Sequence, residues 1–482
     1  KNFCTLNNQW KMIAEKQRKI FQLKIWGNPI TNYTKGLLNL KLMNRIINFI
    51  IILFFVSNVF LLLTVPTSFF VSISFLLFLV ILIVGFVREL ITSKIRLSLF
   101  IYIFGYFFMY LSPIMQLQYG SFPNFIMYNT DKILKTNIII CVFYFLYLIT
   151  DIFTRKNNAK QKDTSFQNLK FNYKMQQYYF VFTLIFSIIT FFMFRFEYFT
   201  TRYTYSNLIT NSSLYLIFFS ATKGIATASL IMEAQKFLTH HKNIRRLLVS
   251  SFLFIYNVNP FNVSRYYISY VVILFMLIFF TKKIKVNQML ILLILGMFFI
   301  FPLLNFFRNG LTFVDFSSYI NLIREQFVSL HFDSYSQLVA DLYYVDINGY
   351  TNGWQFLSAL FFFIPRAIFP GKSEGSGALI GQFLNENTGF YYIARGFSNV
   401  SNPFIGEIFL NFGFIGVVFV PILLVYFMKW VEYKNEFIYM IICSYAIFIM
   451  RGDFMSSFAY AIGSIVFISI IPQIKYERNK QK

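Results

Sequence analysis

The residues best suited to chemistry lie in a polar-rich stretch, Arg308 to Asn402, that interrupts an otherwise apolar chain. Arg366 and Lys372 stand there among apolar neighbours, and a cation in such company needs an anion or a water-filled cavity. A guanidinium group is a planar, permanently charged set of donors that matches phosphate or carboxylate. The stretch therefore predicts an anion-binding site.

A carboxylate and two polar side chains follow the basic residues. Glu407 lies near one end of an apolar segment, where a partly buried carboxylate suits a general base. Asn411 is four residues further on, hence on the same helical face, and could bind a substrate hydroxyl. Ser401 precedes both and is a further candidate for substrate binding. Alternatively, Glu407 forms a structural ion pair with Arg366 or Arg395.

The sequence predicts neither a cofactor nor a metal centre. The Cys, His and carboxylate residues show no metal-ligand spacing, and no Asp-x-Asp pair occurs in the polar stretch. A Gly-x-x-x-x-Gly-Lys loop for nucleotide phosphates is also missing. The net charge of +24 does not indicate a nucleic-acid partner, because its placement follows the membrane rule described next.

Apolar segments recur along most of the 482 residues, which are 57% apolar and only 13% charged. Segments of about 17–25 apolar residues are typical of transmembrane helices, whose backbone satisfies its own hydrogen bonds in lipid. We therefore predict an all-α polytopic membrane protein. About twelve spans are expected, at 46–64, 67–87, 97–111, 133–152, 178–193, 214–231, 247–258, 266–280, 289–306, 404–427, 437–450 and 460–471.

Charge placement orients these predicted spans. Most of the 43 Lys and Arg residues fall on one side, which the positive-inside rule assigns to the cytoplasm. Both termini are then cytoplasmic, and residues 308–402 form one large outer loop with short helices. Within it, 354–368 suggests a re-entrant or interfacial helix that ends at Pro365. The predicted parts are a basic segment 1–45, spans 1–9 in 46–307, the loop 308–402, spans 10–12 in 403–472 and a basic tail 473–482.

Arginine outnumbers lysine on the predicted outer side, whereas lysine dominates the cytoplasmic side. Several of these arginines stand at span ends, where a lipid-linked phosphate would lie. Alternatively, individual arginines pair with nearby carboxylates or extend to lipid headgroups. The candidates for anion binding are Arg265, Arg308, Arg366 and Arg395, and the other outer arginines are Arg195, Arg202, Arg324 and Arg451.

The loop motifs resemble those of Wzy-type O-antigen and repeat-unit polysaccharide polymerases. The resemblance covers about residues 308–416, and the span count and the large outer loop before the last helices agree with it. The residues that carry it are Ile364-Pro365-Arg366, Pro370-Gly371-Lys372, Ser401-Asn402-Pro403, Gly406-Glu407 and Asn411-Phe412-Gly413.

This resemblance implies an inverting, metal-independent glycosyltransferase with a GT-C-like fold in the cytoplasmic (inner) membrane. Such an enzyme works at the periplasmic face on oligosaccharides linked to undecaprenyl pyrophosphate. It moves the growing O-antigen or capsular glycan from its lipid pyrophosphate onto a new lipid-linked repeat unit. A chain-length regulator and a flippase are further expected partners. The implied catalytic residues are Arg366, Arg395 and Glu407, and the implied substrate-binding residues are Arg265, Arg308, Lys372, Asn411 and Ser401.

Two other functions remain open. An O-antigen ligase has a similar architecture but a lipid A acceptor, so its loss leaves a bare lipid A core rather than single-unit glycans. A flippase for lipid-linked oligosaccharides, or another transporter, also fits twelve spans with cationic residues. A transporter is expected to have short loops, two related halves and cations at the membrane midplane. The long outer loop and the lack of internal sequence similarity favour the polymerase.

Overall fold

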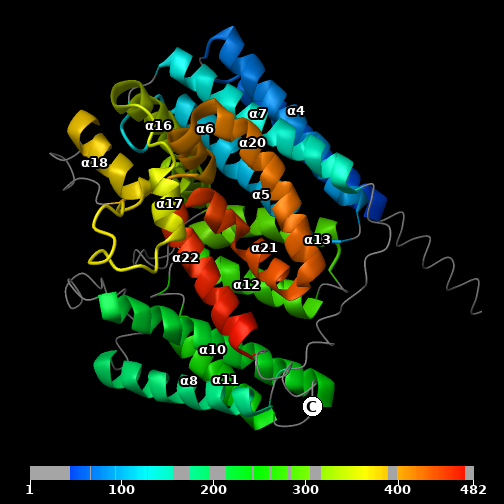
Figure 1. Ribbon diagram of the computed structural model, residues 1–482. Helices are drawn as coiled ribbons and strands as arrows, with labels where there is room; N and C mark the ends of the chain where they lie inside the picture. The colour runs from blue at the N-terminus through cyan, green and yellow to red at the C-terminus, as the bar shows by residue number, and fades with distance from the viewer. Residues whose placement is uncertain are drawn as a thin grey trace, which may run out of the picture. The chain divides into compact units, whose positions relative to one another are not determined.

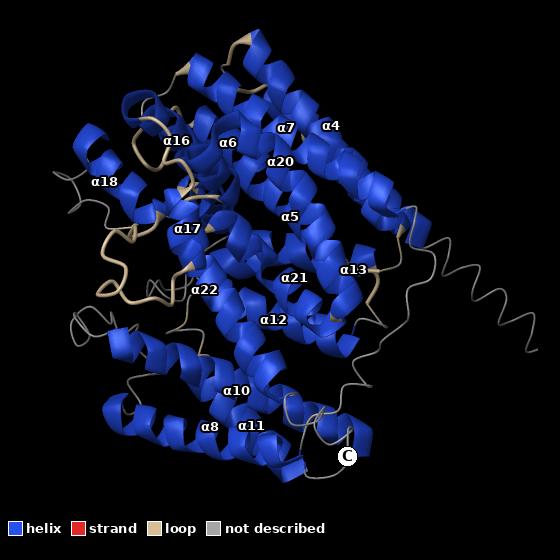
Figure 2. Ribbon diagram, viewed as in Figure 1, coloured by secondary structure: helices blue, strands red, loops and turns tan. Residues whose placement is uncertain are grey.

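The computed structural model describes most of the chain as helices. It describes residues 44–65, 67–92, 94–126, 129–155, 171, 173–194, 213–240, 244–259, 263, 265–280, 284–303, 316–388 and 399–472. The chain divides into two compact units, residues 1–57 and 58–482, and residues 44–57 of the first unit are helical. Every regular element among the described residues is a helix (Figure 2), which confirms the all-α prediction for this part of the chain.

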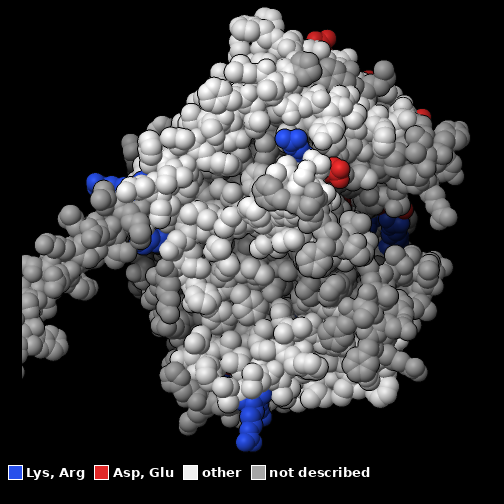
Figure 3. Space-filling model, turned by 180° about the vertical axis from the view of Figure 1, so that it is seen from behind, with Lys and Arg blue, Asp and Glu red and all other residues white. Residues whose placement is uncertain are grey.

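Seven helices in the described part of the chain are long and apolar enough to cross a bilayer. Each coincides with a predicted span, so the polytopic membrane class is supported. The described part of the face drawn in Figure 3 shows broad areas without charged side chains. The seven helices are Asn44–Leu62, Phe69–Ile91, Leu97–Gln118, Thr130–Thr154, Lys174–Met193, Val286–Leu303 and Phe404–Lys434.

The five other predicted spans also coincide with helices. Tyr266–Phe280 and Phe454–Ile470 are apolar but shorter. The helices α11 (Ile244–Asn257) and α21 (Glu436–Arg451) have 14 and 16 residues, fewer than the roughly 20 that span a bilayer upright. Helix α10 (Ser213–His240) carries charged residues within its length. The total of twelve spans stays a prediction.

One buried, continuous helical rod lies in the second unit. It consists of α5 (Leu97–Phe104), the π-helical η1 (Gly105–Leu111) and α6 (Ser112–Gln118). Its aromatic side chains are buried on all sides, which is typical of a helix at the centre of a membrane bundle. Helices α4 (Phe69–Ile91) and α7 (Thr130–Arg155) run side by side next to it (Figure 1).

The remaining apolar helices form two further contact groups. Helix α10 packs on α8 (Tyr173–Phe194) and α11. Helix α12 (Arg265–Phe280) packs on α21, where the rings of Tyr270 and Tyr445 stack with centroids 3.7 Å apart. The chain also forms α3 (Val59–Leu62), α13 (Val286–Leu295), η3 (Gly296–Ile300), α22 (Phe454–Ser464) and η5 (Ile465–Ile470).

The predicted loop folds into helices rather than an irregular chain. Helix α16 (Ser334–Asn348) is buried over its first nine residues and packs against α7 and α20, so it belongs to the core. The loop helices are α15 (Phe316–Val328), η4 (Leu330–Phe332), α16, α17 (Trp354–Leu360) and α18 (Ser376–Thr388). Residues 308–315 and 389–398 of the predicted loop lie outside the described residues.

Helix α20 (Phe404–Lys434) connects the loop helices to the bundle. Gly413 interrupts its helical backbone with φ 60° and ψ −150°. The segment before Gly413 is almost wholly buried, whereas the segment after it exposes many apolar side chains. The kink therefore separates a part that packs on the loop helices from a part with an apolar outer surface.

Candidate functional site

Arg366 is exposed in the turn between α17 and α18. Its Nη1 atom lies 3.0 Å from Glu374 Oε1, and the two side chains are 56% and 71% exposed. Exposed ion pairs of this kind contribute little free energy because water screens them. The guanidinium group can therefore exchange Glu374 for the anion of a ligand at small cost.

Lys372 holds the turn that presents Arg366. Its Nζ atom donates hydrogen bonds to the carbonyl oxygens of Phe362, at 2.5 Å, and Ile364, at 3.0 Å. Partial burial, together with the positive charge of Arg366, lowers the pKa of Lys372. Trp354 Nε1 donates to the carbonyl of Gly371 at 2.9 Å. The turn is thus fixed by its own hydrogen bonds, and Lys372 acts as a brace in this structure.

Glu407 and Asn411 lie inside the protein. Glu407 is 1% exposed, and its Oε2 atom accepts a hydrogen bond from the backbone nitrogen of Phe454 at 2.9 Å. Asn411 donates to the carbonyl of Glu407 at 2.7 Å. The Oδ1 atom of Asn411 accepts from Thr351 Oγ1 at 2.9 Å and from the backbone nitrogen of Phe356 at 3.3 Å. Asn411 thereby ties the start of α17 to α20.

The structure places the other predicted site residues as follows. Ser401 donates to Asp333 Oδ1 at 2.5 Å. Arg265 is the first residue of α12, and its side chain is not among the described ones. Arg308 and Arg395 lie outside the described residues. The expected convergence of four arginines therefore remains a prediction. The alternative ion pair of Glu407 with Arg366 is wrong, because Arg366 pairs with Glu374 and Glu407 is buried and bonds to the backbone of Phe454. The alternative pair with Arg395 lies outside the described residues.

Three buried carboxylates in this part of the protein were missed by the sequence analysis. Asp341 and Asp453 are close enough to Glu407 for their charges to interact, whereas Asp333 accepts a hydrogen bond from Ser401. Asp333 and Asp341 belong to the start and middle of α16, and Asp453 is the N-cap of α22. We call Asp333, Asp341, Glu407 and Asp453 the acid cluster. A signal was available for Asp341, because it interrupts the apolar sequence Leu-Val-Ala-Asp-Leu. A lone carboxylate in such a sequence is costly unless it is paired or neutral.

Asp333 is the member of the acid cluster with a positive partner. Arg451 Nη2 lies 3.5 Å from Asp333 Oδ1, and both side chains are largely buried. Arg451 also donates to the carbonyls of His331 and Leu330 and covers the ring of Tyr266 at 4.4 Å. Burial raises the pKa of Asp333, although Arg451 and two hydrogen-bond donors oppose the shift. In this structure Arg451 joins α21 to η4.

Asp341 and Asn402 form a buried pair. Asn402 Nδ2 donates to Asp341 Oδ1 at 3.1 Å, and both residues are fully buried. Asp341 Oδ2 and Asn402 Oδ1 accept no hydrogen bond from the described residues. Both atoms lie against Gly406, where a Cβ atom would be 2.1 Å from Asp341 Oδ2 and 3.0 Å from Asn402 Oδ1.

Two neighbouring buried acceptors without a donor are costly. A proton on Asp341 Oδ2 would turn this atom into a donor and leave one buried acceptor fewer without a partner. Burial, followed by the charge of Glu407, raises the pKa of Asp341 well above its ordinary value, although the Asn402 amide opposes the shift. The neutral acid is therefore the form of Asp341 that fits this site.

Glu407 and Asp453 meet the N-terminus of α22. Asp453 Oδ2 accepts from the backbone nitrogen of Ser456 at 3.2 Å, and Glu407 accepts from that of Phe454. Free backbone donors at a helix N-terminus stabilise negative charge. Ser376 Oγ donates to Asp453 Oδ1 at 3.1 Å. Since Ser376 is two residues after Glu374, the exposed ion pair and the acid cluster are joined by a short piece of chain.

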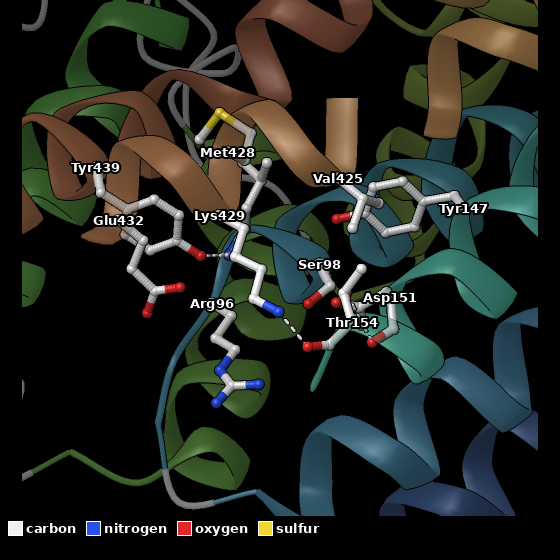
Figure 4. Close-up of a pocket in the computed structure, with 11 residues that line it drawn as sticks. Arg96, Ser98, Tyr147, Asp151, Thr154, Val425, Met428, Lys429, Glu432 and Tyr439 are labelled. Atoms are coloured by element: carbon white, nitrogen blue, oxygen red, sulfur yellow. Dashed lines mark hydrogen bonds between the residues drawn. The ribbon is translucent and has the colours of Figure 1, made fainter. Parts of the chain in front are cut away.

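Two cavities lie apart from Arg366 and Glu407. An apolar cavity of about 160 Å³ is lined by Tyr266, Met297 and Phe448 among others. A charged cavity of about 70 Å³ lies near the C-terminal end of α20 (Figure 4). There Lys429 extends to the carbonyl of Thr154, and Arg96 lies nearby. Neither Arg366 nor Glu407 lines either cavity.

The carboxylates that line the charged cavity are paired with basic side chains. Asp151 pairs with Arg88 at 3.0 Å, and Glu432 pairs with Lys94 at 3.2 Å. The two carboxylates that line the cavity therefore already have cationic partners. We therefore assign it a structural role and place the candidate site at Arg366.

The described residues offer no arrangement of three or more His, Cys, Asp or Glu side chains that could hold a metal ion. In the acid cluster, Asp333 bonds to Arg451, Asp453 to hydroxyl and backbone donors, and Glu407 to one backbone nitrogen. The chemistry open to the site is binding of an anion at Arg366, whose partner Glu374 lies two residues before Ser376, the residue that bonds to Asp453. Comparison with known proteins adds no identity, since no family model, curated protein or solved structure matches the chain.

Proposed function

We propose that the protein is a membrane glycosyltransferase that polymerises lipid-linked oligosaccharide repeat units. One observation carries the proposal: an exposed arginine, held by a braced turn among apolar residues, is paired among the described residues with an exposed, exchangeable carboxylate alone. The polytopic helical architecture and the folded loop between two candidate spans support it. The motif resemblance of residues 308–416 supplies the class of substrate.

In the proposed reaction an acceptor hydroxyl attacks the anomeric carbon of the growing glycan. A carbon–oxygen bond forms, and the bond to the lipid diphosphate breaks with its electron pair left on the diphosphate. Guanidinium groups can stabilise that developing charge in place of a metal ion. We assign this role to Arg366 together with Arg395, with Arg265 or Arg308 as further donors.

The hydroxyl proton goes to a base, for which Glu407 remains the candidate. Glu407 Oε1 accepts no hydrogen bond from the described residues. Because the carboxyl is buried, an acceptor can reach it only if part of the surrounding protein moves. We propose that Ser376, which donates a hydrogen bond to the neighbouring Asp453, belongs to the part that moves.

The proposed location is the cytoplasmic membrane, with the loop helices on its outer face. The substrates are oligosaccharides on undecaprenyl pyrophosphate, and bilayer lipids surround the protein. This assignment rests on the charge asymmetry of the sequence. A chain-length regulator and a flippase are its expected partners.

The test is turnover of a synthetic lipid-linked repeat unit by purified protein without added metal. We expect long glycans from the unsubstituted protein and a loss of about 10²–10³-fold in extension rate for Arg366→Ala. Arg366→Lys keeps the charge but not the planar pair of donors and should restore only part of the rate. Arg324→Ala, in the exposed α15, is the matched control and should extend normally.

Normal chain extension by Arg366→Ala would exclude the proposed role of this arginine. Extension that requires an added divalent metal would exclude the metal-independent mechanism. Transfer to a lipid A acceptor instead of a lipid-linked repeat unit would identify a ligase.

A further inference from the structure

Helix α17 buries a mainly polar face and exposes an apolar one. The buried face carries Gln355, Ser358 and Ala359. The exposed face carries Trp354, Leu357 and Leu360. A helix on the surface of a protein in water normally shows the opposite arrangement, because apolar side chains gain free energy by leaving water.

Hydrogen bonds fix this reversed orientation. The Ser373 hydroxyl bonds to Gln355 Oε1, and the backbone nitrogen of Ser373 donates to Ser358 Oγ at 3.1 Å. The rings of Phe356 and Phe454 stack with centroids 4.6 Å apart. Turning the helix to bury its leucines would break these contacts. The apolar face is therefore held outward.

The turn after α17 extends the same surface. Phe363 and Ile368 are 67% and 76% exposed, and they flank Arg366 on either side. With the exposed face of α17 they give a series of exposed apolar side chains between Trp354 and Ile368. Exposed apolar surfaces of this extent mark contact with a partner or a membrane.

The surface of α20 indicates which partner this is. The ring of Phe356 lies 5.9 Å from that of Phe412, and a Cβ atom on Gly353 would be 2.9 Å from the Phe412 ring. Beyond Phe412, α20 continues as a candidate membrane span with Ile415 and Phe419 exposed. Helix α17 thus adjoins, through Phe356 and Gly353, a helix whose surface lipid would cover.

The backbone of the turn is suited to a low-polarity environment. The nitrogen atoms of Ile364 and Ile368 donate to the carbonyls of Phe361 and Pro365. Lys372 Nζ satisfies the carbonyls of Phe362 and Ile364. Non-helical backbone near the hydrocarbon needs such internal partners. Seven helical residues are about 10 Å long, too short to cross about 30 Å of hydrocarbon.

We propose that residues 354–369 insert into one leaflet of the bilayer, with Phe363 and Ile368 in the acyl-chain region. Arg366 and Glu374 then lie at the level of the phospholipid headgroups. The partner is the lipid surface itself, and insertion is driven by the apolar side chains. It requires neither the proposed reaction nor a particular headgroup.

The experiment places an environment-sensitive fluorophore on single cysteines in the full chain, reconstituted into phosphatidylcholine vesicles. Cys4→Ser removes the cysteine outside the described residues, while Cys141 and Cys443 are buried and stay. The probe sites are Phe363→Cys and Ile368→Cys. Glu386→Cys, on an exposed position of α18, is the matched control.

We expect probes at 363 and 368 to emit at shorter wavelength and to be quenched by nitroxide-labelled lipid acyl chains but not by aqueous iodide. The probe at 386 should show the reverse. Vesicles containing phosphatidylglycerol should give the same pattern. Iodide quenching at both 363 and 368 equal to that at 386 would overturn the proposal. Shielding of both sites from iodide and from lipid nitroxide alike would also overturn it, because a protein surface would then cover the segment.

Discussion

At the scale of single residues, each of the four buried carboxyls in the acid cluster has a different kind of partner. Asp333 has Arg451, Asp453 has hydroxyl and amide donors at a helix N-terminus, and Glu407 has one backbone donor. Among the described residues, Asp341 has the amide of Asn402 as its one hydrogen-bond donor. A carboxyl without a positive partner in an apolar interior avoids the cost of charge by keeping its proton.

This difference leads to a prediction for Asp341→Asn. A folded-state pKa raised above the unfolded value of about 4 means that the folded protein binds the proton more tightly. The contribution of this proton to the free energy of unfolding is then complete below the unfolded-state pKa. It is lost as pH rises toward and through the folded-state pKa. The amide cannot ionise, so the variant should lose this part of the pH dependence and match or exceed the parent stability in alkaline buffer.

Thermal unfolding in detergent across acid to alkaline buffers measures this effect. In the Cys4→Ser chain, a thiol-reactive dye can follow it, because Cys141 and Cys443 are buried and become accessible on unfolding. Asp131→Asn, at an exposed position of α7, should leave the pH dependence unchanged. An Asp341→Asn protein that is less stable than the parent in alkaline buffer would mean that Asp341 is ionised in the fold.

At the scale of elements, the kink of α20 determines where the loop helices meet the apolar bundle. Gly413 has a backbone conformation that is essentially restricted to glycine. A Cβ atom there would also lie 3.0 Å from the ring of Tyr350. The kink thus lets Tyr350 pack against α20 while the following segment continues as a candidate span.

Gly413→Ala should destabilise the protein by about 1–3 kcal/mol, from backbone strain alone. The contact with Tyr350 adds to this cost. Gly463→Ala is the matched control, since a Cβ atom on Gly463 in α22 meets nothing within 4 Å, and alanine favours a helix by roughly 0.5–1 kcal/mol over glycine. The midpoint of thermal unfolding compares the two variants. Equal midpoints for Gly413→Ala and the parent would show that α20 can straighten without loss.

At the scale of the whole molecule, the positions of the helices could be predicted far better than their contacts. Lipid requires long apolar segments, so each predicted span coincides with a helix. The burial of α16 was not predicted, because its sequence is mixed and its apolar face becomes evident only against α7 and α20. Arg366 and Glu407 were recognisable by residue type. Their partners were not, because Asn402–Asp341 and Phe454–Glu407 join residues far apart in the chain.

The orientation of the molecule is the remaining prediction at this scale. The positive-inside rule places Glu374 outside and Lys434, at the end of α20, inside. In the Cys4→Ser chain, a membrane-impermeant maleimide should label Glu374→Cys in intact cells. Lys434→Cys should react only after the membrane is permeabilised. Both positions are exposed, so failure to react reflects the membrane rather than burial.

The opposite labelling pattern would place Arg366 in the cytoplasm and remove the proposed polymerase, whose substrates face outward. The insertion of residues 354–369 would survive that result, because it depends on the apolar surface shared with α20 and not on which leaflet is entered. Labelling of both positions in intact cells would instead mean that α20 does not cross the bilayer. In that case the apolar surface shared by α17 and α20 would need a partner other than lipid.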